Sequence, residues 1–267
     1  MLNVRFSFPG KKALITGSAP EGGIGYEIAK LFLESGASVV LHSHLSQSIA
    51  LPNGVPTNAH FLQQDLQFTG ELPSFFDKAC DLLNGEIDYL ILNAGVYKEP
   101  NLWDLKAEQL SFTVAINLLA PIMLTSRFAA RCRAAGKGGR VVATTSVNAD
   151  LSEPQHTGYD ASKSGVNGFV RSAAMELAQQ NILVNAVAPG LVATPITGMG
   201  FADDPDLRRS LEDQIPLGRI ATPQELAAIY LFLCSDCCNQ VTGSIWASDG
   251  GLGANQLSLR PISADGK

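Results

Sequence analysis

Basic clusters, long apolar runs and regularly spaced cysteines are the features that this sequence has least of. Its 19 lysines and arginines are outnumbered by 25 aspartates and glutamates, so the formal net charge is -6 and no basic block attracts a phosphate backbone or an anionic membrane. No apolar run approaches the roughly 18 residues of a membrane span, and residues 1–12 lack the apolar core of a signal peptide. We therefore expect a cytoplasmic protein that binds neither nucleic acid nor membrane.

The five cysteines form no disulfide ladder, and the four histidines lie far from them along the chain. We accordingly predict no structural metal site. Cys234 and Cys237 have the Cys-x-x-Cys spacing of a redox pair. They close an apolar helix expected over Leu226–Cys234, without a thioredoxin-like strand–helix–strand pattern around it, so we interpret them as structural.

Short β-rich apolar runs alternate with longer amphipathic stretches through nearly the whole chain. This alternation is typical of repeated strand–helix units and a parallel sheet. With 267 residues and 46% hydrophobic content, the chain can bury the core of one α/β domain, which we expect to span residues 1–267. The seven predicted strands are Ala13–Thr16, Ser38–Ser43, His60–Leu62, Asp88–Asn93, Arg140–Ser146, Leu183–Ala188 and Ser244–Ser248.

Apolar residues recur at helical spacing over Ile24–Phe32 and again over Val166–Leu177, which predicts a buried helix face in each. Residues 46–58 lack this periodicity and contain two prolines and a glycine, so the helix expected there is short or missing. Residues 256–267 are polar, and we expect either a loose tail or an arm on a neighbouring subunit.

A glycine-rich loop, Thr16–Gly25, follows the first predicted strand and opens the first helix. Glycines let the backbone turn tightly and approach a pyrophosphate, whose charge is favoured at the helix N-terminus. The loop lacks the third glycine of the G-x-G-x-x-G pattern, and a glycine-rich turn can also be purely structural. Its position nevertheless favours dinucleotide binding.

Tyr159 and Lys163 are four residues apart at the head of a predicted helix, which places them on one face. An ammonium near a phenol favours the phenolate, so we expect Lys163 to lower the pKa of Tyr159. Ser146 ends a predicted strand, and 159 − 146 = 13 residues separate it from the tyrosine. Asn117 interrupts an apolar helical run, where it is costly unless hydrogen-bonded. The alternative for each is an ordinary structural side chain.

These motifs, in this order, resemble the short-chain dehydrogenase/reductase family. Thr16-Gly17 with Gly23-Ile24-Gly25 is similar to its Thr-Gly-x-x-x-Gly-x-Gly loop with two residues inserted, a spacing that resembles the enoyl-acyl-carrier-protein reductases of the same superfamily. Asn93-Ala94-Gly95 resembles the family's Asn-Asn-Ala-Gly, with Leu92 in place of the first asparagine. The resemblance covers about 11–251 and implies a doubly wound Rossmann-type α/β fold, a seven-stranded parallel sheet flanked by helices.

The activity that the resemblance implies is NAD(P)-dependent interconversion of a ketone and a secondary alcohol by hydride transfer. Its catalytic residues are then Tyr159 as general acid/base, Ser146 on the carbonyl, Lys163 on the nicotinamide ribose, and Asn117 holding a water that relays protons. The cofactor-binding residues are Gly17, Ser18, Gly23, Ile24, Gly25, Ser43, His44, Asp65, Leu66, Asn93, Ala94, Gly95, Tyr159, Lys163, Pro189, Gly190, Val192 and Thr194.

The second strand ends in Ser43 and His44, without the carboxylate that would bind a ribose 2′-hydroxyl and repel a 2′-phosphate. We therefore predict NADP(H), with NAD(H) as the alternative. The family resemblance also implies a homo-oligomer, either a tetramer or a dimer.

The expected substrate is a small carbonyl or alcohol compound, covered by a lid over residues 193–221. A lone histidine such as His156, which is expected in this pocket, is more often structural. The residues expected to line this pocket are Tyr97, Val147, Asn148, His156, Met199 and Phe201.

Two other functions fit part of the pattern. An enoyl (C=C) reductase would explain the longer glycine loop, but that class spaces its tyrosine and lysine further apart, and Gly165 stands six residues after Tyr159. A catalytically silent nucleotide-sensing or scaffold protein would have the same fold. The intact Asn, Ser, Tyr and Lys positions argue against it.

Overall fold

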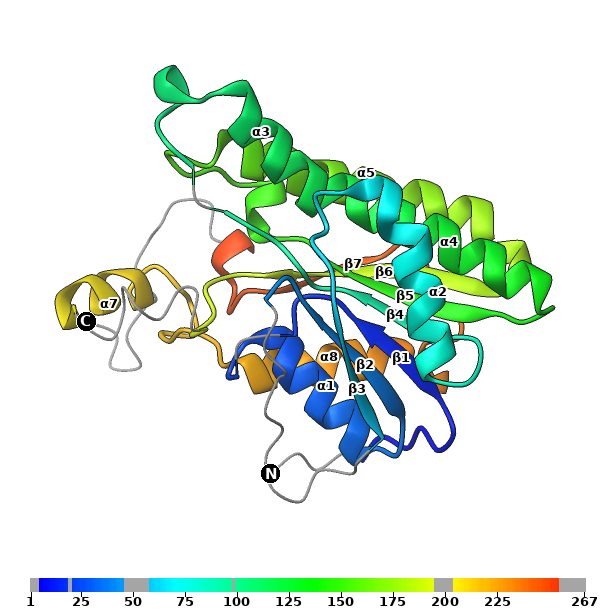
Figure 1. Cartoon of the computed structure of the whole chain (residues 1–267). Helices are drawn as coiled ribbons and strands as arrows, with labels where there is room; N and C mark the ends of the chain where they lie inside the picture. Colours follow the sequence, from blue (N-terminus) through cyan, green and yellow to red (C-terminus); the bar gives the residue numbers. More distant parts are fainter. Residues whose placement is uncertain (1–4, 19–20, 46–57, 98, 195–203, 255–267) are drawn as a thin grey trace.

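The computed structural model describes residues 5–18, 21–45, 58–97, 99–194 and 204–254. Its centre is one seven-stranded parallel sheet in the order β3-β2-β1-β4-β5-β6-β7 (Figure 1). Every predicted strand is present, with ends within two residues of those expected. The strands are β1 Lys12–Ile15, β2 Ser38–Ser43, β3 Ala59–Gln63, β4 Tyr89–Leu92, β5 Gly139–Thr144, β6 Ile182–Pro189 and β7 Ile245–Ser248.

Helices cover both faces of the sheet (Figure 1). One face is covered by α1 (Ile24–Glu34) and α8 (Pro223–Cys234), and the other by α2 (Leu72–Leu82), α4 (Ala120–Ala134) and α5 (Thr157–Leu177). This confirms the doubly wound arrangement. It also explains why the central strands are apolar on both sides, since neither side of a strand meets water.

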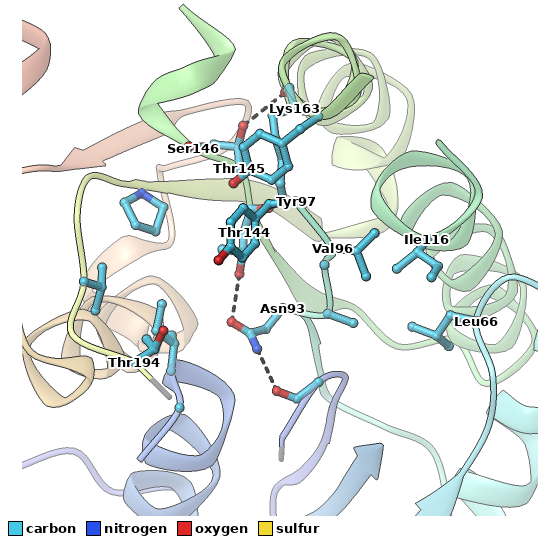
Figure 2. Close-up of a pocket in the computed structure, with 18 of the residues that line it drawn as sticks. Leu66, Asn93, Val96, Tyr97, Ile116, Thr144, Thr145, Ser146, Lys163 and Thr194 are labelled. Atoms are coloured by element: carbon cyan, nitrogen blue, oxygen red, sulfur yellow. Dashed lines mark hydrogen bonds between the residues drawn. The ribbon is translucent and has the colours of Figure 1, made fainter. Parts of the chain in front are cut away.

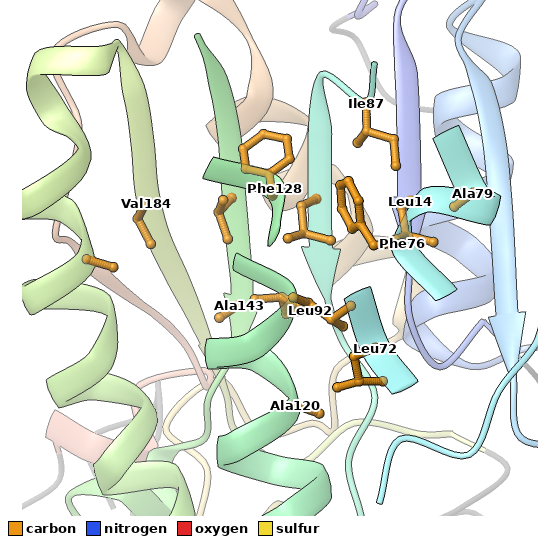
Figure 3. Packing of buried hydrophobic residues seen from close by; sticks show 14 of the residues in the cluster. Leu14, Leu72, Phe76, Ala79, Ile87, Leu92, Ala120, Phe128, Ala143 and Val184 are labelled. Carbon is orange, nitrogen blue, oxygen red and sulfur yellow. The ribbon is translucent and has the colours of Figure 1, made fainter. Parts of the chain in front are cut away.

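The core is split by the sheet into two layers. On one side, Leu72 and Phe76 of α2 and Phe128 of α4 pack against strand residues such as Leu92 and Val184 (Figure 3). The other layer packs α1 and α8 against the alternate residues of the same strands. The alternation along β1, with Leu14 in the first layer and Ile15 in the second, is the period-two pattern of a strand buried on both faces.

The sheet reverses its winding between β1 and β4, which are neighbours in it. The chain leaves β1 for α1 on one face, and leaves β4 for α3 (Ala107–Val114) and α4 towards the other face. The two connections diverge, and a crevice opens at the carboxyl ends of the strands, the usual ligand site of such sheets.

One continuous helical run, Ala107–Ala134, joins α3, a π-helical turn (Ala115–Leu119) and α4. It is long and apolar enough by composition to cross a membrane, which we did not expect from the sequence. Of its most apolar window, 44% is buried, and α4 packs against α2, α5 and the sheet. Much of its apolar character is therefore used in internal packing.

A helix, α7 (Pro205–Glu212), lies within residues 193–221, the segment expected to form the lid, and the sequence analysis did not predict it. Asp204 accepts hydrogen bonds from the backbone N–H groups of Asp206 and Leu207, and Pro205 occupies the first turn, where it costs no hydrogen bond. The predictions for residues 46–57 and 256–267, and for Met199 and Phe201, lie outside the described residues.

Candidate active site

A cavity of about 370 Å³ occupies the crevice at the carboxyl ends of the strands (Figure 2). It brings together residues that sequence reasoning drew from seven separate segments. The predicted site residues that line it are Gly17, Gly23, Ile24, Ser43, His44, Asp65, Leu66, Asn93, Ala94, Gly95, Tyr97, Ser146, Tyr159, Lys163, Pro189, Gly190, Val192 and Thr194.

The glycine loop is packed backbone to backbone against the end of β4. Gly17 has φ +68°, and a Cβ there would lie 2.7 Å from the Ala94 Cα. A Cβ on Gly25 would overlap the Gly17 carbonyl oxygen and lie 2.6 Å from the Asn93 Nδ2. Bare backbone and the start of α1 therefore face the cavity together, a fit for a dinucleotide pyrophosphate.

Ser18 and Gly25, both predicted to bind the cofactor, do not line the cavity. Ser18 is fully buried, and its Oγ donates to the Ile15 carbonyl at 2.7 Å and accepts from the His42 N–H at 3.3 Å. The side chain is thus used to tie the loop to the sheet. Any contact of these two residues with a cofactor stays a prediction.

His42, at the end of β2, holds the loop from the other side. Its Nδ1 accepts from the Gly17 N–H at 3.1 Å, and its Nε2 donates to the Gln64 carbonyl at 2.8 Å, which requires the neutral Nε2–H tautomer. Burial lowers the pKa of His42 to about 4, so the ring stays neutral at physiological pH.

Tyr159 and Lys163 face the same cavity from successive turns of α5. The Lys163 Nζ lies 5.7 Å from the centroid of the Tyr159 ring and donates to the Thr144 carbonyl at 2.8 Å. Ser146, which follows β5, lines the same cavity and interacts with the Tyr159 hydroxyl. Three of the four predicted catalytic residues therefore meet at one point.

The pKa of Tyr159 departs from our expectation. Burial raises it, and the interaction with Ser146 only partly opposes this. The expected lowering by Lys163 is absent because its ammonium lies over the ring face and is held by the Thr144 carbonyl rather than by the phenol oxygen. Burial also lowers the pKa of Lys163 to about 8, so the ammonium still predominates at neutral pH.

Asn117, the fourth predicted catalytic residue, lies in the π-helical turn and does not line the cavity. Its Oδ1 accepts from the Val96 N–H at 2.9 Å, and its Nδ2 donates to the Val96 carbonyl at 2.8 Å and to the Ser162 Oγ at 3.1 Å. The side chain is thus a satisfied buried amide that ties the end of β4 to α5. A part for Asn117 in a proton relay stays a prediction.

The predicted substrate residues divide into those on the cavity and those behind it. Tyr97 lines the cavity and stacks on His156 at 6.0 Å between ring centroids, and His156 meets the Tyr159 ring edge-on at 5.7 Å. Asn148 donates to the Asp160 carboxylate at 3.2 Å and, like Val147 and His156, is not among the lining residues. Among the described members of this set, only Tyr97 forms part of the cavity wall, whereas His156 packs against the Tyr159 ring.

Comparison with known proteins places this site in a family. The sequence profile of a family described as enoyl-(acyl carrier protein) reductase matches residues 17–253. The 3alpha-hydroxysteroid dehydrogenase of Mediterraneibacter gnavus is 33% identical over 248 residues, covering 90% of this chain and 96% of that protein. The 3-oxoacyl-(acyl-carrier-protein) reductase FabG of Aquifex aeolicus is 30% identical over 248 residues, covering 91% and 97%.

A solved structure agrees. The putative short-chain alcohol dehydrogenase of Sinorhizobium meliloti 1021 superposes with a TM-score of 0.83 at 29% identity, covering 94% of this chain and 100% of that one. The chain belongs to the short-chain dehydrogenase/reductase family. Membership confirms the predicted Rossmann-type fold. It also confirms the predicted activity, NAD(P)-dependent interconversion of ketones and alcohols, and favours it over enoyl reduction.

Several residues of the site in this short-chain dehydrogenase/reductase were not predicted from the sequence. Glu99 is buried, and its Oε2 accepts from the Gly158 N–H at 2.8 Å, which caps α5 one residue before Tyr159. His156, just before α5, makes no capping side-chain hydrogen bond, so the first N–H groups of this helix need an acceptor from elsewhere in the chain. The lining residues not predicted are His42, Val96, Phe112, Ile116, Thr144, Thr145 and Leu191.

Proposed function

We propose that Tyr159 is the general acid/base with which this enzyme interconverts a small-molecule ketone and its secondary alcohol. The observation that carries the proposal is that Tyr159 and Ser146 line one cavity together with Lys163 and the glycine loop. A nicotinamide dinucleotide, when bound, supplies or accepts the hydride. Ser146 then donates a hydrogen bond to the carbonyl oxygen, and Tyr159 gives that oxygen its proton.

The raised pKa of Tyr159 suits the reducing direction of this proposal. A phenol whose pKa is raised stays protonated at neutral pH and so is ready to donate. Lys163, held by the Thr144 carbonyl, presents its remaining N–H groups towards the cavity side, where a ribose hydroxyl would accept them.

NADP(H) is the proposed cofactor, with NAD(H) as the alternative. The support lies at the end of β2, where Ser43 and His44 line the cavity and the only carboxylate among the described lining residues is Asp65. The Asp65 oxygens already accept from the Gln67 N–H at 3.0 Å and from the Gln67 side chain at 2.6 Å. A larger rise in melting temperature with NADPH than with NADH would support this preference, and the reverse order would contradict it.

We further propose a cytoplasmic homo-oligomer, a tetramer or a dimer. All five cysteines are free thiols, as is usual in a reducing compartment. On α4, Ile122 and Met123 are more than one-third exposed, beside a 580 Å³ groove between α4 and α5 that a second copy could cover. Light scattering coupled to size exclusion tests the assembly state directly.

The decisive experiment is Tyr159→Phe, assayed by NADPH and NADH oxidation with a panel of ketones. We expect turnover to fall by about 10²–10⁴-fold because the proton donor is lost, while cofactor affinity is kept. Tyr89→Phe, which removes a hydroxyl from a tyrosine on β4 away from the cavity, is the matched control. Unchanged turnover in Tyr159→Phe would refute the assignment. A protein that binds cofactor but never turns over would instead favour the silent sensor.

A further inference from the structure

Tyr230 is a fully buried tyrosine on α8, on the face of the sheet opposite α5, and no catalytic step uses it. Its hydroxyl lies 2.6 Å from the Thr144 Oγ1, at the end of β5. The Thr144 Oγ1 also lies 3.3 Å from the Asn93 Oδ1, and the Asn93 Nδ2 lies 2.9 Å from the Gly17 carbonyl oxygen (Figure 2). A chain of polar groups therefore runs from α8 through the sheet to the glycine loop.

The direction of this chain is fixed by its last member. The Gly17 carbonyl can only accept, so the Asn93 amide must present its nitrogen to Gly17 and its oxygen to Thr144. The Asn93 Oδ1 can also only accept, so Thr144 must donate its single hydroxyl proton to it. The Thr144 Oγ1 can then only accept from Tyr230, so the tyrosine hydroxyl must be the donor.

We infer that Tyr230 is a positioning residue for the glycine loop, because its hydroxyl donates to Thr144 and thereby aims the Thr144 proton at Asn93. The inference rests on the proposal that this loop binds the dinucleotide. Burial raises the pKa of Tyr230, which keeps the phenol protonated and able to donate. At zero exposure, the hydroxyl has no competing bond to bulk water.

Two contacts explain why a residue on α8 affects the cofactor site. The Asn93 amide touches both ends of the loop, since it bonds to the Gly17 carbonyl and occupies the space that a Cβ on Gly25 would need. Thr144 also holds the Lys163 ammonium with its main-chain carbonyl at 2.8 Å. Fixing the Thr144 side chain thus preorganises the loop before the cofactor arrives, which lowers the entropic cost of binding.

The test is Tyr230→Phe in the full chain, with dissociation constants for NADPH and NADH measured by fluorescence titration without ketone. Because this bond exists with and without cofactor, only the lost preorganisation of the loop acts on Kd, and we expect Kd to rise by about 3- to 10-fold, with one net hydrogen bond as the upper limit. We expect kcat at saturating cofactor to stay within about twofold of wild type. The peptide that contains Gly17 should exchange amide hydrogens faster in the cofactor-free variant. Tyr89→Phe, another buried tyrosine of the same apolar layer, should change none of these readouts.

A second pair of variants tests the route. Thr144→Val removes the middle hydroxyl, and adding Tyr230→Phe to it should leave Kd unchanged, because Tyr230 acts through that hydroxyl. Additive effects on Kd would overturn the inference. So would a Tyr230→Phe protein that is less stable but binds as tightly as wild type, since that result indicates a purely structural hydroxyl. If wild type binds neither dinucleotide, the proposed function itself fails, which the wild-type titration shows separately.

Discussion

Lys163 is a buried ammonium, and we predict that Lys163→Met stabilises the fold while it abolishes turnover. The residue is 3% exposed, and burial is the cause that lowers its pKa from the ordinary 10.5 to about 8. Methionine has a similar unbranched shape and no charge. The fold is therefore expected to tolerate it, whereas the site loses the group proposed to hold the nicotinamide ribose.

The magnitude follows from the pKa. A fall from 10.5 to about 8 corresponds to a cost of about 3 kcal/mol for keeping the ammonium charged in the folded protein, at about 1.4 kcal/mol per tenfold change in proton affinity. The variant escapes this cost but loses the hydrogen bond to the Thr144 carbonyl, worth about 1 kcal/mol. We expect Lys163→Met to be about 2 kcal/mol more stable at pH 7.

The gain should depend on pH in a defined direction. Between pH 8 and 10.5 the unfolded chain binds more protons at Lys163 than the folded protein does, so the free energy of unfolding of wild type rises with pH across this window. The advantage of the variant is therefore fully present below pH 8 and lost by about pH 10.5. Below pH 8 both folded and unfolded lysines are charged, and the difference stays constant.

Urea unfolding of both proteins without cofactor at pH 7, 8, 9 and 10 measures this difference. Lys78→Met, which changes an exposed lysine on α2, controls for surface charge and should stay within about 0.5 kcal/mol of wild type at each pH. A Lys163→Met protein that is less stable than wild type at pH 7, or a gain that does not shrink with pH, would refute the reasoning.

Three further predictions follow from other contacts. Gly25→Ala should raise the Kd for the dinucleotide at least about tenfold in a fluorescence titration, because its Cβ overlaps the Gly17 carbonyl; an unaltered Kd would contradict the packing. Glu99→Ala should lower the free energy of unfolding by about 1–2 kcal/mol in urea, since Gly158 loses its acceptor, with Glu99→Gln less affected because an oxygen remains. Because the pKa of His42 is lowered to about 4, its neutral ring contributes fully to the free energy of unfolding above pH 6.5, and about 3 kcal/mol is lost as the pH falls towards 4. Urea unfolding at acid pH should show this loss in wild type and not in His42→Gln.

The sheet and the Tyr159–Lys163 pair were predictable because their signals are local. Strands buried on both faces appear as short apolar runs, and a separation of four residues on a helix decides which side chains share a face. The glycine loop was placed correctly by the same kind of reasoning. The start of α7 was also predictable from local sequence, because Asp204 and Pro205 form a typical helix beginning, but this helix was not predicted.

The missed parts of the site depend on contacts between distant segments. Tyr230 and Thr144 are 86 residues apart, and Glu99 and Gly158 are 59 apart, so no periodicity connects either pair. The inward turn of Ser18 is a contact with the sheet rather than a property of its own segment. The pKa of Tyr159 was predicted in the wrong direction for the same reason, since burial comes from the whole fold whereas the lysine was visible in the sequence.

The double use of Thr144 has a consequence for redesign. Its carbonyl holds the Lys163 ammonium and its hydroxyl holds the Asn93 amide beside the glycine loop, so a substitution of Thr144 made to alter one contact disturbs the other. Ser43 and His44, at the end of β2, lie on a different strand from this junction. An engineer who wants to change the preference between NADPH and NADH should therefore begin at β2, whose end is separate from the contacts of Thr144.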